Sequence, residues 1–347
     1  MAVDERVKHV FVCGLHRSGT TVLARCIGKL RDCTSFENTG VLMDEGQYLQ
    51  NVYPVDDAYG GPGRFGFSIG AHLTENSSLL TAANISKLRA SWDAHWDQSK
   101  PVRVEKTPSN LLMTRFLQAA FPNSYFVVIK RHPVAVSLAT QRWCLTPLHR
   151  LFEHWMLCHE IFDQDKAFLR HVYELTYENF VSDPQKHLKQ IADFIGIDFV
   201  GAPEQRVDKR CNAKYLDRWA QMLSSSPLSA YYFRLARMYE DGFAAHGYSV
   251  TELIAATSFG VPERNLLCRA ADALLYPVAD VWYASRLHHG WYRRIGRPVA
   301  TILEVCGLET LKCGLTASLK RLLTHGQGVR RWTVGRHAER EGQSYSL

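Results

Sequence analysis

Short apolar runs alternate with segments of helical periodicity along the first part of the chain. Residues 9–13 (HVFVC) form an apolar run that stops at Gly14, which predicts a buried strand. Over residues 22–30, apolar side chains recur at the three- and four-residue spacing of a helix. Residues 125–129 (YFVVI) are β-branched or aromatic throughout and uncharged, which favours a central strand. The chain therefore begins with a strand, a tight glycine-containing loop and a helix.

The same alternation continues through the next segments. We expect further strands at 33–36, 102–105 and 171–176, and a loop rich in glycine and proline at 53–70. We expect helices at 44–51, 86–96, 111–120, 133–143, 151–169 and 184–195. Strands that alternate with helices predict an α/β fold, in which a parallel β-sheet is flanked by helices.

Beyond about residue 250 the pattern changes to helical segments without strand signals. We place a domain boundary there, between an α/β domain of residues 1–250 and a basic, helical C-terminal extension of residues 251–347. The helices expected in the extension are 265–276, 299–305 and 311–323.

The extension also carries most of the net positive charge. It holds 13 Lys and Arg against 8 Asp and Glu, which is +5 of the formal net charge of +7. Aromatic residues lie beside its arginines, so an acidic membrane surface is one candidate partner, and packing into a homodimer is the other. The residues concerned are Trp282, Tyr283, Trp291 and Tyr292, beside Arg286, Arg293 and Arg294.

Composition excludes several classes of protein. With 46% apolar and 22% charged residues, the chain is globular and too apolar for a disordered protein. No stretch reaches the roughly 18 to 20 apolar residues of a membrane-spanning helix. Charges within residues 1–8 argue against a signal peptide, so we expect a cytoplasmic location. The nine cysteines are scattered without a CxxC spacing, so we expect neither a zinc site nor a disulfide framework.

Residues 14–21 (GLHRSGTT) have the glycine spacing of a phosphate-binding loop, between a predicted strand and a predicted helix. Backbone N–H groups of such a loop converge on an anion, and the helix N-terminus adds its positive end. A nucleoside triphosphatase would carry Lys where this chain has Thr20, and the cation comes earlier, as Arg17. The next central strand ends in Lys130 and Arg131 rather than in a magnesium-binding Asp. The sequence therefore predicts two anion-binding positions and no metal ligand.

Four segments together resemble the sulfotransferases that use 3′-phosphoadenylyl sulfate (PAPS). Residues 14–21 are similar to that family's 5′-phosphosulfate loop, and residues 104–108 (VEKTP) to its EK[TS]P segment. Residues 126–143 resemble its strand–loop–helix for the 3′-phosphate, and residues 175–196 its RYEDLxxDPxxxLxxIxxFLG segment. The segments follow the family's order, and the resemblance covers about residues 9–220. Carbohydrate, tyrosyl-protein and bacterial small-molecule branches share these motifs, so the acceptor stays open.

The resemblance implies a P-loop sulfotransferase fold and a PAPS-dependent enzyme. Such an enzyme moves a sulfuryl group from PAPS to a hydroxyl or amine of a carbohydrate, a lipid or a small molecule. It implies no metal and no nucleic-acid partner. A P-loop phosphotransferase with an altered loop, and a non-catalytic scaffold with the same fold, are the alternatives.

The resemblance also implies roles for the residues of the phosphate loop and the two basic positions. Arg17 would bind the 5′-phosphate, together with the backbone N–H groups of Ser18, Gly19, Thr20 and Thr21. Lys106 would stabilise the bridging oxygen as the sulfuryl group leaves, because fixed donors that meet developing charge are usually the largest catalytic contribution. Arg131 would bind the 3′-phosphate, since a guanidinium makes two parallel contacts to phosphate.

Three further positions are implied around the nucleotide. The family places a Ser eight residues after the second Arg, where this chain has Ala139. Ser137 and Thr140 are therefore the candidate hydroxyl groups for the 3′-phosphate. Tyr177 is a candidate for lining the nucleotide pocket.

The acceptor hydroxyl must also lose its proton to a base. Several branches of the family have a Glu about twenty residues past the loop arginine, and Glu37 stands there in this chain. A shift of one residue would place Asn38 at that spot. Glu45 is the rival carboxylate, and His16, beside the loop arginine, is a third candidate.

Overall fold

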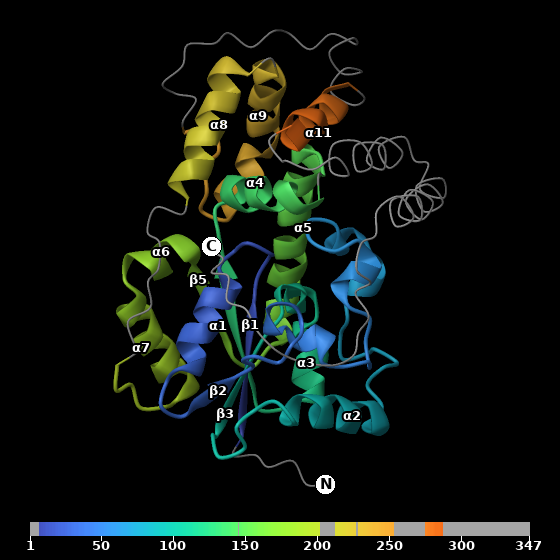
Figure 1. Cartoon of the computed structure of the whole chain (residues 1–347), viewed down its shortest axis with the longest axis vertical. Coiled ribbons are helices and arrows are strands. Elements are labelled where there is room, and N and C mark those ends of the chain that lie inside the picture. The colour runs from blue at the N-terminus through green and yellow to red at the C-terminus, as the bar shows by residue number, and fades with distance from the viewer. Residues whose placement is uncertain (1–6, 145, 202–211, 227, 253–274, 287–347) are drawn as a thin grey trace, which may run out of the picture.

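The computed structural model describes residues 7–144, 146–201, 212–226, 228–252 and 275–286. Its centre is a five-stranded sheet in the order β2–β3–β1–β4–β5 (Figure 1). All the strand pairs are parallel, which confirms the predicted α/β fold. The strands are β1 (Lys8–Cys13), β2 (Cys33–Ser35), β3 (Val102–Lys106), β4 (Ser124–Lys130) and β5 (Val172–Thr176).

Helices cover both faces of this sheet (Figure 1). The alternating side chains of β1 separate the two cores, since Val10 and Val12 face one way and Phe11 and Cys13 the other. The first core packs under α1 (Thr20–Gly28), α6 (Tyr177–Ser182) and α7 (Pro184–Ile195). The second core packs under α2 (Ala82–Asp93), α3 (Thr114–Ala120) and α5 (Leu148–Asp165).

The bounds of the helices follow from local signals in the sequence. Helix α7 begins after Asp183, whose Oδ1 accepts from the backbone N–H of Lys186 at 3.1 Å, with Pro184 in the first turn. It ends at Gly196, which has the left-handed φ of 72° that favours glycine. In the same way Thr81 caps α2, which therefore begins earlier than the predicted residue 86.

Residues 42–71 contain short 3₁₀ turns rather than the predicted helix at 44–51 and plain loop at 53–70. The predicted helix at 111–120 is likewise divided, into η6 and α3, where Met113 leaves helical geometry (φ −129°). These turns pack against the second core and bring polar side chains to the sheet edge described below. They are η1 (Leu42–Asp44), η2 (Gly46–Tyr48), η3 (Asp56–Tyr59), η4 (Phe65–Phe67), η5 (Ile69–Ala71), η6 (Pro108–Leu112) and, after α5, η7 (Lys166–Phe168).

Four helices gather beyond one end of the sheet, in the upper part of Figure 1. They are α4 (Pro133–Cys144), α8 (Ala213–Ser225), α9 (Ser229–Ala245) and α11 (Tyr276–Arg286), of which α8, α9 and α11 were not predicted from the sequence. Helix α11 lies beyond the expected boundary at residue 250 and packs against α4 and α5. Its buried Asp280 accepts from the backbone N–H of Leu148 at 2.7 Å and from the Tyr232 hydroxyl at 2.8 Å.

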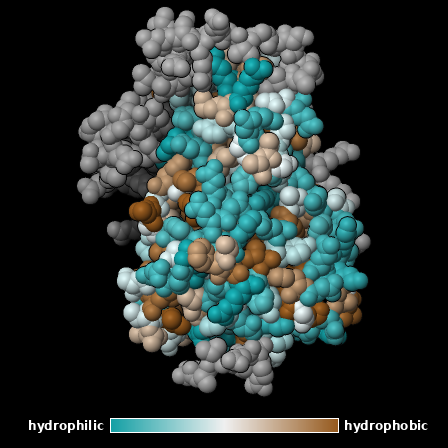
Figure 2. Space-filling model, turned by 180° about the vertical axis from the view of Figure 1, so that it is seen from behind, coloured by the Kyte–Doolittle hydropathy of each residue, from teal (hydrophilic) through white to brown (hydrophobic). Residues whose placement is uncertain are grey.

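The rest of the C-terminal extension falls outside the described residues. This holds for the predicted helices 299–305 and 311–323, for nearly all of the one at 265–276, and for the side chains of the basic and aromatic residues named above. Among the helices that are described, none combines the length and the hydropathy needed to cross a membrane. On the face seen in Figure 2, hydrophobic residues are scattered among hydrophilic ones.

Candidate functional site

The loop between β1 and α1 is shaped to present backbone N–H groups. Gly14 has φ +153°, and a Cβ there would lie 2.4 Å from the carbonyl oxygen of Ile129. The Ser18 N–H donates to the Leu15 carbonyl at 3.0 Å and closes the loop. Gly19, with φ +97°, precedes α1, and no side chain caps the helix. The N–H groups of the first turn therefore lack partners within the helix and form a site for an anion.

Two side chains of this loop add further donors. Arg17 is exposed with a left-handed φ of 70°, and its guanidinium lies 4.5 Å from the centre of the Trp143 ring. Ser18 is fully buried, and its hydroxyl has no hydrogen-bond partner within the described part of the chain. Thr20 is buried at the start of α1, and Thr21 lines a cavity that Lys106 also lines.

Arg131, directly after β4, lies against the same loop. Its Nη1 donates to the Arg17 carbonyl at 2.7 Å, and its Nε donates to Asn212 Oδ1 at 2.7 Å. The guanidinium stacks 4.2 Å from the ring centre of Tyr177. Its Nη2 is buried and finds no partner among the residues that the structure describes. The structure therefore brings the two predicted cationic positions together.

The segment that begins α6 holds Arg131 in this position. Tyr177 also packs on the phosphate loop, since a Cβ on Gly19 would lie 2.5 Å from its ring. Glu178 Oε1 accepts from Asn212 Nδ2 at 2.5 Å and from the backbone N–H of His132 at 3.0 Å. Sequence analysis did not predict these contacts of Asn212 and Glu178, although the Tyr–Glu pair belongs to the segment with the RYEDL-like motif.

Ser137 and Thr140 lie on α4, which begins two residues after Arg131. Both are buried with hydroxyl groups that lack partners within the described residues. They line a small cavity together with Leu15, His16 and His154, and Arg131 is not part of its lining. Ala139 is buried as well. The two hydroxyl groups are thus placed beside the N-terminal half of the phosphate loop.

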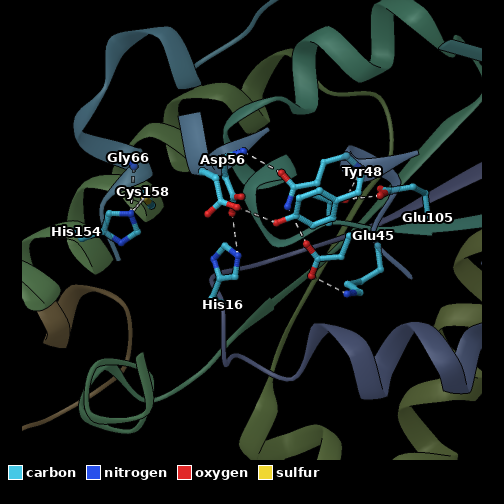
Figure 3. A network of polar contacts seen from close by, with 12 residues as sticks. His16, Glu45, Tyr48, Asp56, Gly66, Glu105, His154 and Cys158 are labelled. Carbon is cyan, nitrogen blue, oxygen red and sulfur yellow. Dashed lines mark hydrogen bonds and ion pairs between the residues drawn. The ribbon is translucent and has the colours of Figure 1, made fainter. Parts of the chain in front are cut away.

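Lys106 ends β3 and forms a buried ion pair with Glu45, which is labelled in Figure 3. Its Nζ donates to Glu45 Oε1 at 2.8 Å and to the Met43 carbonyl at 3.1 Å. The side chains of Lys106 and Glu45 are only 5% and 8% exposed. Glu37 and Asn38, in contrast, are exposed. Of the candidate bases, the structure brings Glu45 into contact with Lys106.

His16 belongs to the same polar network (Figure 3). Its Nε2 lies 2.9 Å from Oδ2 of the buried Asp56, and its buried Nδ1 has no partner within the described residues. The amide of Gln47 connects this pair to Glu45, because its Nε2 donates to Glu45 Oε2 at 2.8 Å and its Oε1 accepts from the Asp56 N–H at 2.9 Å. A network therefore runs from Lys106 to His16. Gln47 and Asp56 were not found from the sequence, where neither carries a local motif.

Residues 9–201 match a family model described as the sulfotransferase family. Among solved structures, the chain is similar to the sulfotransferase domain of the curacin biosynthetic pathway, with 15% identity over 70% of this chain and 98% of that chain and a TM-score of 0.41. It is also similar to a sulfotransferase of Mycobacterium tuberculosis H37Rv, with 16% identity, 69% and 77% coverage and a TM-score of 0.39. Retinol dehydratase in complex with retinol and PAP matches with 14% identity, 76% and 85% coverage and a TM-score of 0.28. No curated protein matches the chain.

Proposed function

The chain belongs to the sulfotransferase family, and we propose that it transfers a sulfuryl group from PAPS to a hydroxyl or amine of a carbohydrate, a lipid or a small molecule. The observation that carries this proposal is the contact between Arg131 Nη1 and the carbonyl of Arg17. It joins the second cationic position directly to the phosphate loop. One nucleotide with anionic groups at two places can therefore engage both.

The polar groups of the site fit such a nucleotide. PAPS carries a phosphosulfate at the 5′ position and a separate phosphate at the 3′ position. Ser18 Oγ and Arg131 Nη2 are buried donors without partners among the described residues, which is rare in native proteins unless a ligand or water completes them. The uncapped start of α1 and the Arg17 guanidinium favour the 5′ end, and Arg131 favours the 3′-phosphate.

The residues around Lys106 suit transfer to an acceptor. When bound, PAPS supplies an activated sulfuryl group: the acceptor oxygen or nitrogen bonds to sulfur, the bond from sulfur to the 5′-phosphate oxygen breaks, and adenosine 3′,5′-bisphosphate leaves. Lys106 and Arg17 place positive charge where the leaving oxygen gains negative charge. Glu45, held at 2.8 Å from Lys106, accepts the proton of the acceptor group.

The donor can be tested by binding. Calorimetry should show that adenosine 3′,5′-bisphosphate binds without added metal and more tightly than ATP with magnesium. Binding of ATP with magnesium alone would refute the assignment and favour a phosphotransferase.

The transfer step needs an acceptor panel. Incubation with ³⁵S-labelled PAPS and a set of glycans, lipids and phenols should label at least one class. Glu45→Gln should lower the rate about 100-fold, whereas Glu37→Gln, at an exposed carboxylate, serves as the matched control and should leave it unchanged. The reverse result would assign the base to Glu37.

A further inference from the structure

Glu105 is a fully buried carboxylate that the proposed chemistry does not use. It precedes Lys106 in β3 and accepts three hydrogen bonds. Its Oε1 accepts from the Gly46 N–H at 3.0 Å and from the Thr107 hydroxyl at 2.6 Å, and its Oε2 accepts from Asn110 Nδ2 at 2.5 Å. Burial raises the pKa of Glu105 from 4.5 to about 7. A buried carboxylate disfavours folding, so its presence here calls for a role beyond packing.

The backbone of Gly46 is held at both its N–H and its carbonyl group. Glu105 accepts from its N–H, and the indole Nε1 of Trp92 donates to its carbonyl at 2.9 Å. The packing is tight, because a Cβ on Gly46 would lie 2.5 Å from Glu105 Oε1. Gly46 stands between Glu45 and Gln47, so the position of its backbone sets where those two side chains begin.

Two consecutive residues of β3 therefore hold two consecutive residues of the facing segment. Glu105 binds the backbone of Gly46, and Lys106 binds the side chain of Glu45. Figure 3 shows Glu45, Tyr48 and Glu105 together in this network. A strand of the central sheet cannot shift easily. The two contacts from β3 therefore restrict the movement of the segment of short turns that holds Glu45 and Gly46.

We propose that Glu105 is a positioning residue that keeps Glu45 aligned on Lys106 through the backbone N–H of Gly46. The inference rests on the proposed function in that it assigns the aligned pair to sulfuryl transfer. The alignment itself is a property of the structure and can be measured without any transfer reaction.

Glu105→Leu removes every acceptor at this position, and Glu105→Gln is the conservative rescue. Gln keeps an oxygen for the Gly46 N–H, and its amide can donate to Asn110 Oδ1, which has no partner among the described residues, if the Asn110 amide turns over. Asn110→Ala is the matched control, because it removes a contact of Glu105 that does not reach Gly46.

The first readout is the acetylation rate of Lys106 by acetic anhydride, followed by mass spectrometry. Lys106 should react about tenfold faster in Glu105→Leu than in the unmodified protein, because its carboxylate partner moves away. The rate should stay near the original in Glu105→Gln and Asn110→Ala. Lys130, which pairs with Glu174 at 3.0 Å, is the internal control and should not change.

The second readout is kinetic. Glu105→Leu should lower kcat about 100-fold with little change in the affinity for adenosine 3′,5′-bisphosphate, and Glu105→Gln should recover most of the rate. If Glu105→Leu does not fold, Trp92→Phe releases the carbonyl of Gly46 and should change both readouts in the same direction.

The two readouts separate the two proposals. Absence of sulfuryl transfer in the unmodified protein would refute the proposed function, and the acetylation rates would still decide the positioning role. Equal acetylation of Lys106 in Glu105→Leu and Asn110→Ala, or an unchanged rate in Glu105→Leu, would overturn the positioning role.

Discussion

Replacing Arg131 by Lys tests whether this side chain recognises a 3′-phosphate. Lys keeps the charge but has one nitrogen in place of three. In the structure, Nε donates to Asn212 Oδ1 and Nη1 donates to the Arg17 carbonyl, both at 2.7 Å. The remaining Nη2 has no partner within the described residues and is the group proposed to meet phosphate. A single ammonium cannot satisfy all three directions.

The size of the effect follows from the contacts that are lost. A hydrogen bond to a charged group is worth about 1.5 to 3 kcal/mol, and Lys must give up at least one such contact to the ligand. We therefore expect the affinity for adenosine 3′,5′-bisphosphate to fall about 10- to 150-fold. AMP, which has only the 5′-phosphate, should lose much less, because the phosphate loop stays in place.

Isothermal titration calorimetry with both nucleotides measures this difference. The unmodified protein should bind the bisphosphate more tightly than AMP, and Arg131→Lys should remove most of that preference. Arg150→Lys is the matched control, since Arg150 forms a partly exposed pair with Glu153 on α5 and should change neither affinity. An equal loss for AMP and the bisphosphate would refute the reasoning, because Arg131 would then only support the loop.

Three further changes test the site and its energetics. Lys106→Met should lower kcat at least about 100-fold. It should also lower the unfolding free energy by about 3 to 5 kcal/mol, because Glu45 is left as a buried unpaired charge. Adding Glu45→Gln to the same chain should restore the stability measured by urea unfolding but not the activity. Gly19→Ala forces a Cβ to 2.5 Å from the Tyr177 ring at φ +97°. The melting temperature should therefore fall by several degrees and the affinity for the bisphosphate by more than about tenfold. An unaltered affinity would contradict this. The pKa of Glu105 is raised to about 7 by burial, so its protonated form stabilises the fold below pH 4.5, and roughly 3 kcal/mol of this is lost as pH rises through 7. Glu105→Gln lacks this titration, so its unfolding free energy relative to the unmodified protein should rise between pH 4.5 and 8. A difference in unfolding free energy that stays constant over this range would refute the raised pKa of Glu105.

The parts that sequence predicted well are those with short-range signals. The apolar strand before Gly14, the glycine spacing of the loop and the uncharged run at 125–129 each depend on residues close in the chain. They predicted the parallel sheet and two anion-binding positions, and the structure brings these positions together where Arg131 contacts the Arg17 carbonyl. The ends of these strands and the glycine turn after residue 13 are decided by neighbouring residues, so the pattern was sufficient there.

The parts that sequence could not predict depend on distant partners. Asn212, which binds Arg131, is 81 positions away from it in the sequence, and Trp92, which binds the Gly46 carbonyl, is 46 positions away from Gly46. The short turns of residues 42–71 have no periodicity of their own and take their shape from such contacts. For the same reason spacing favoured Glu37 as the base, whereas Glu45 is the carboxylate that contacts Lys106.

The central place of β1 has a consequence for synthesis on the ribosome. This strand emerges before its neighbours β3 and β4, which begin at Val102 and Ser124. One of its edges therefore waits for residues 102–106 and the other for residues 124–130 before it can pair. Nascent chains of this length offer an unpaired hydrophobic strand, a species prone to aggregation. A chaperone that covers residues 8–13 until β4 has emerged would protect β1 while it is unpaired.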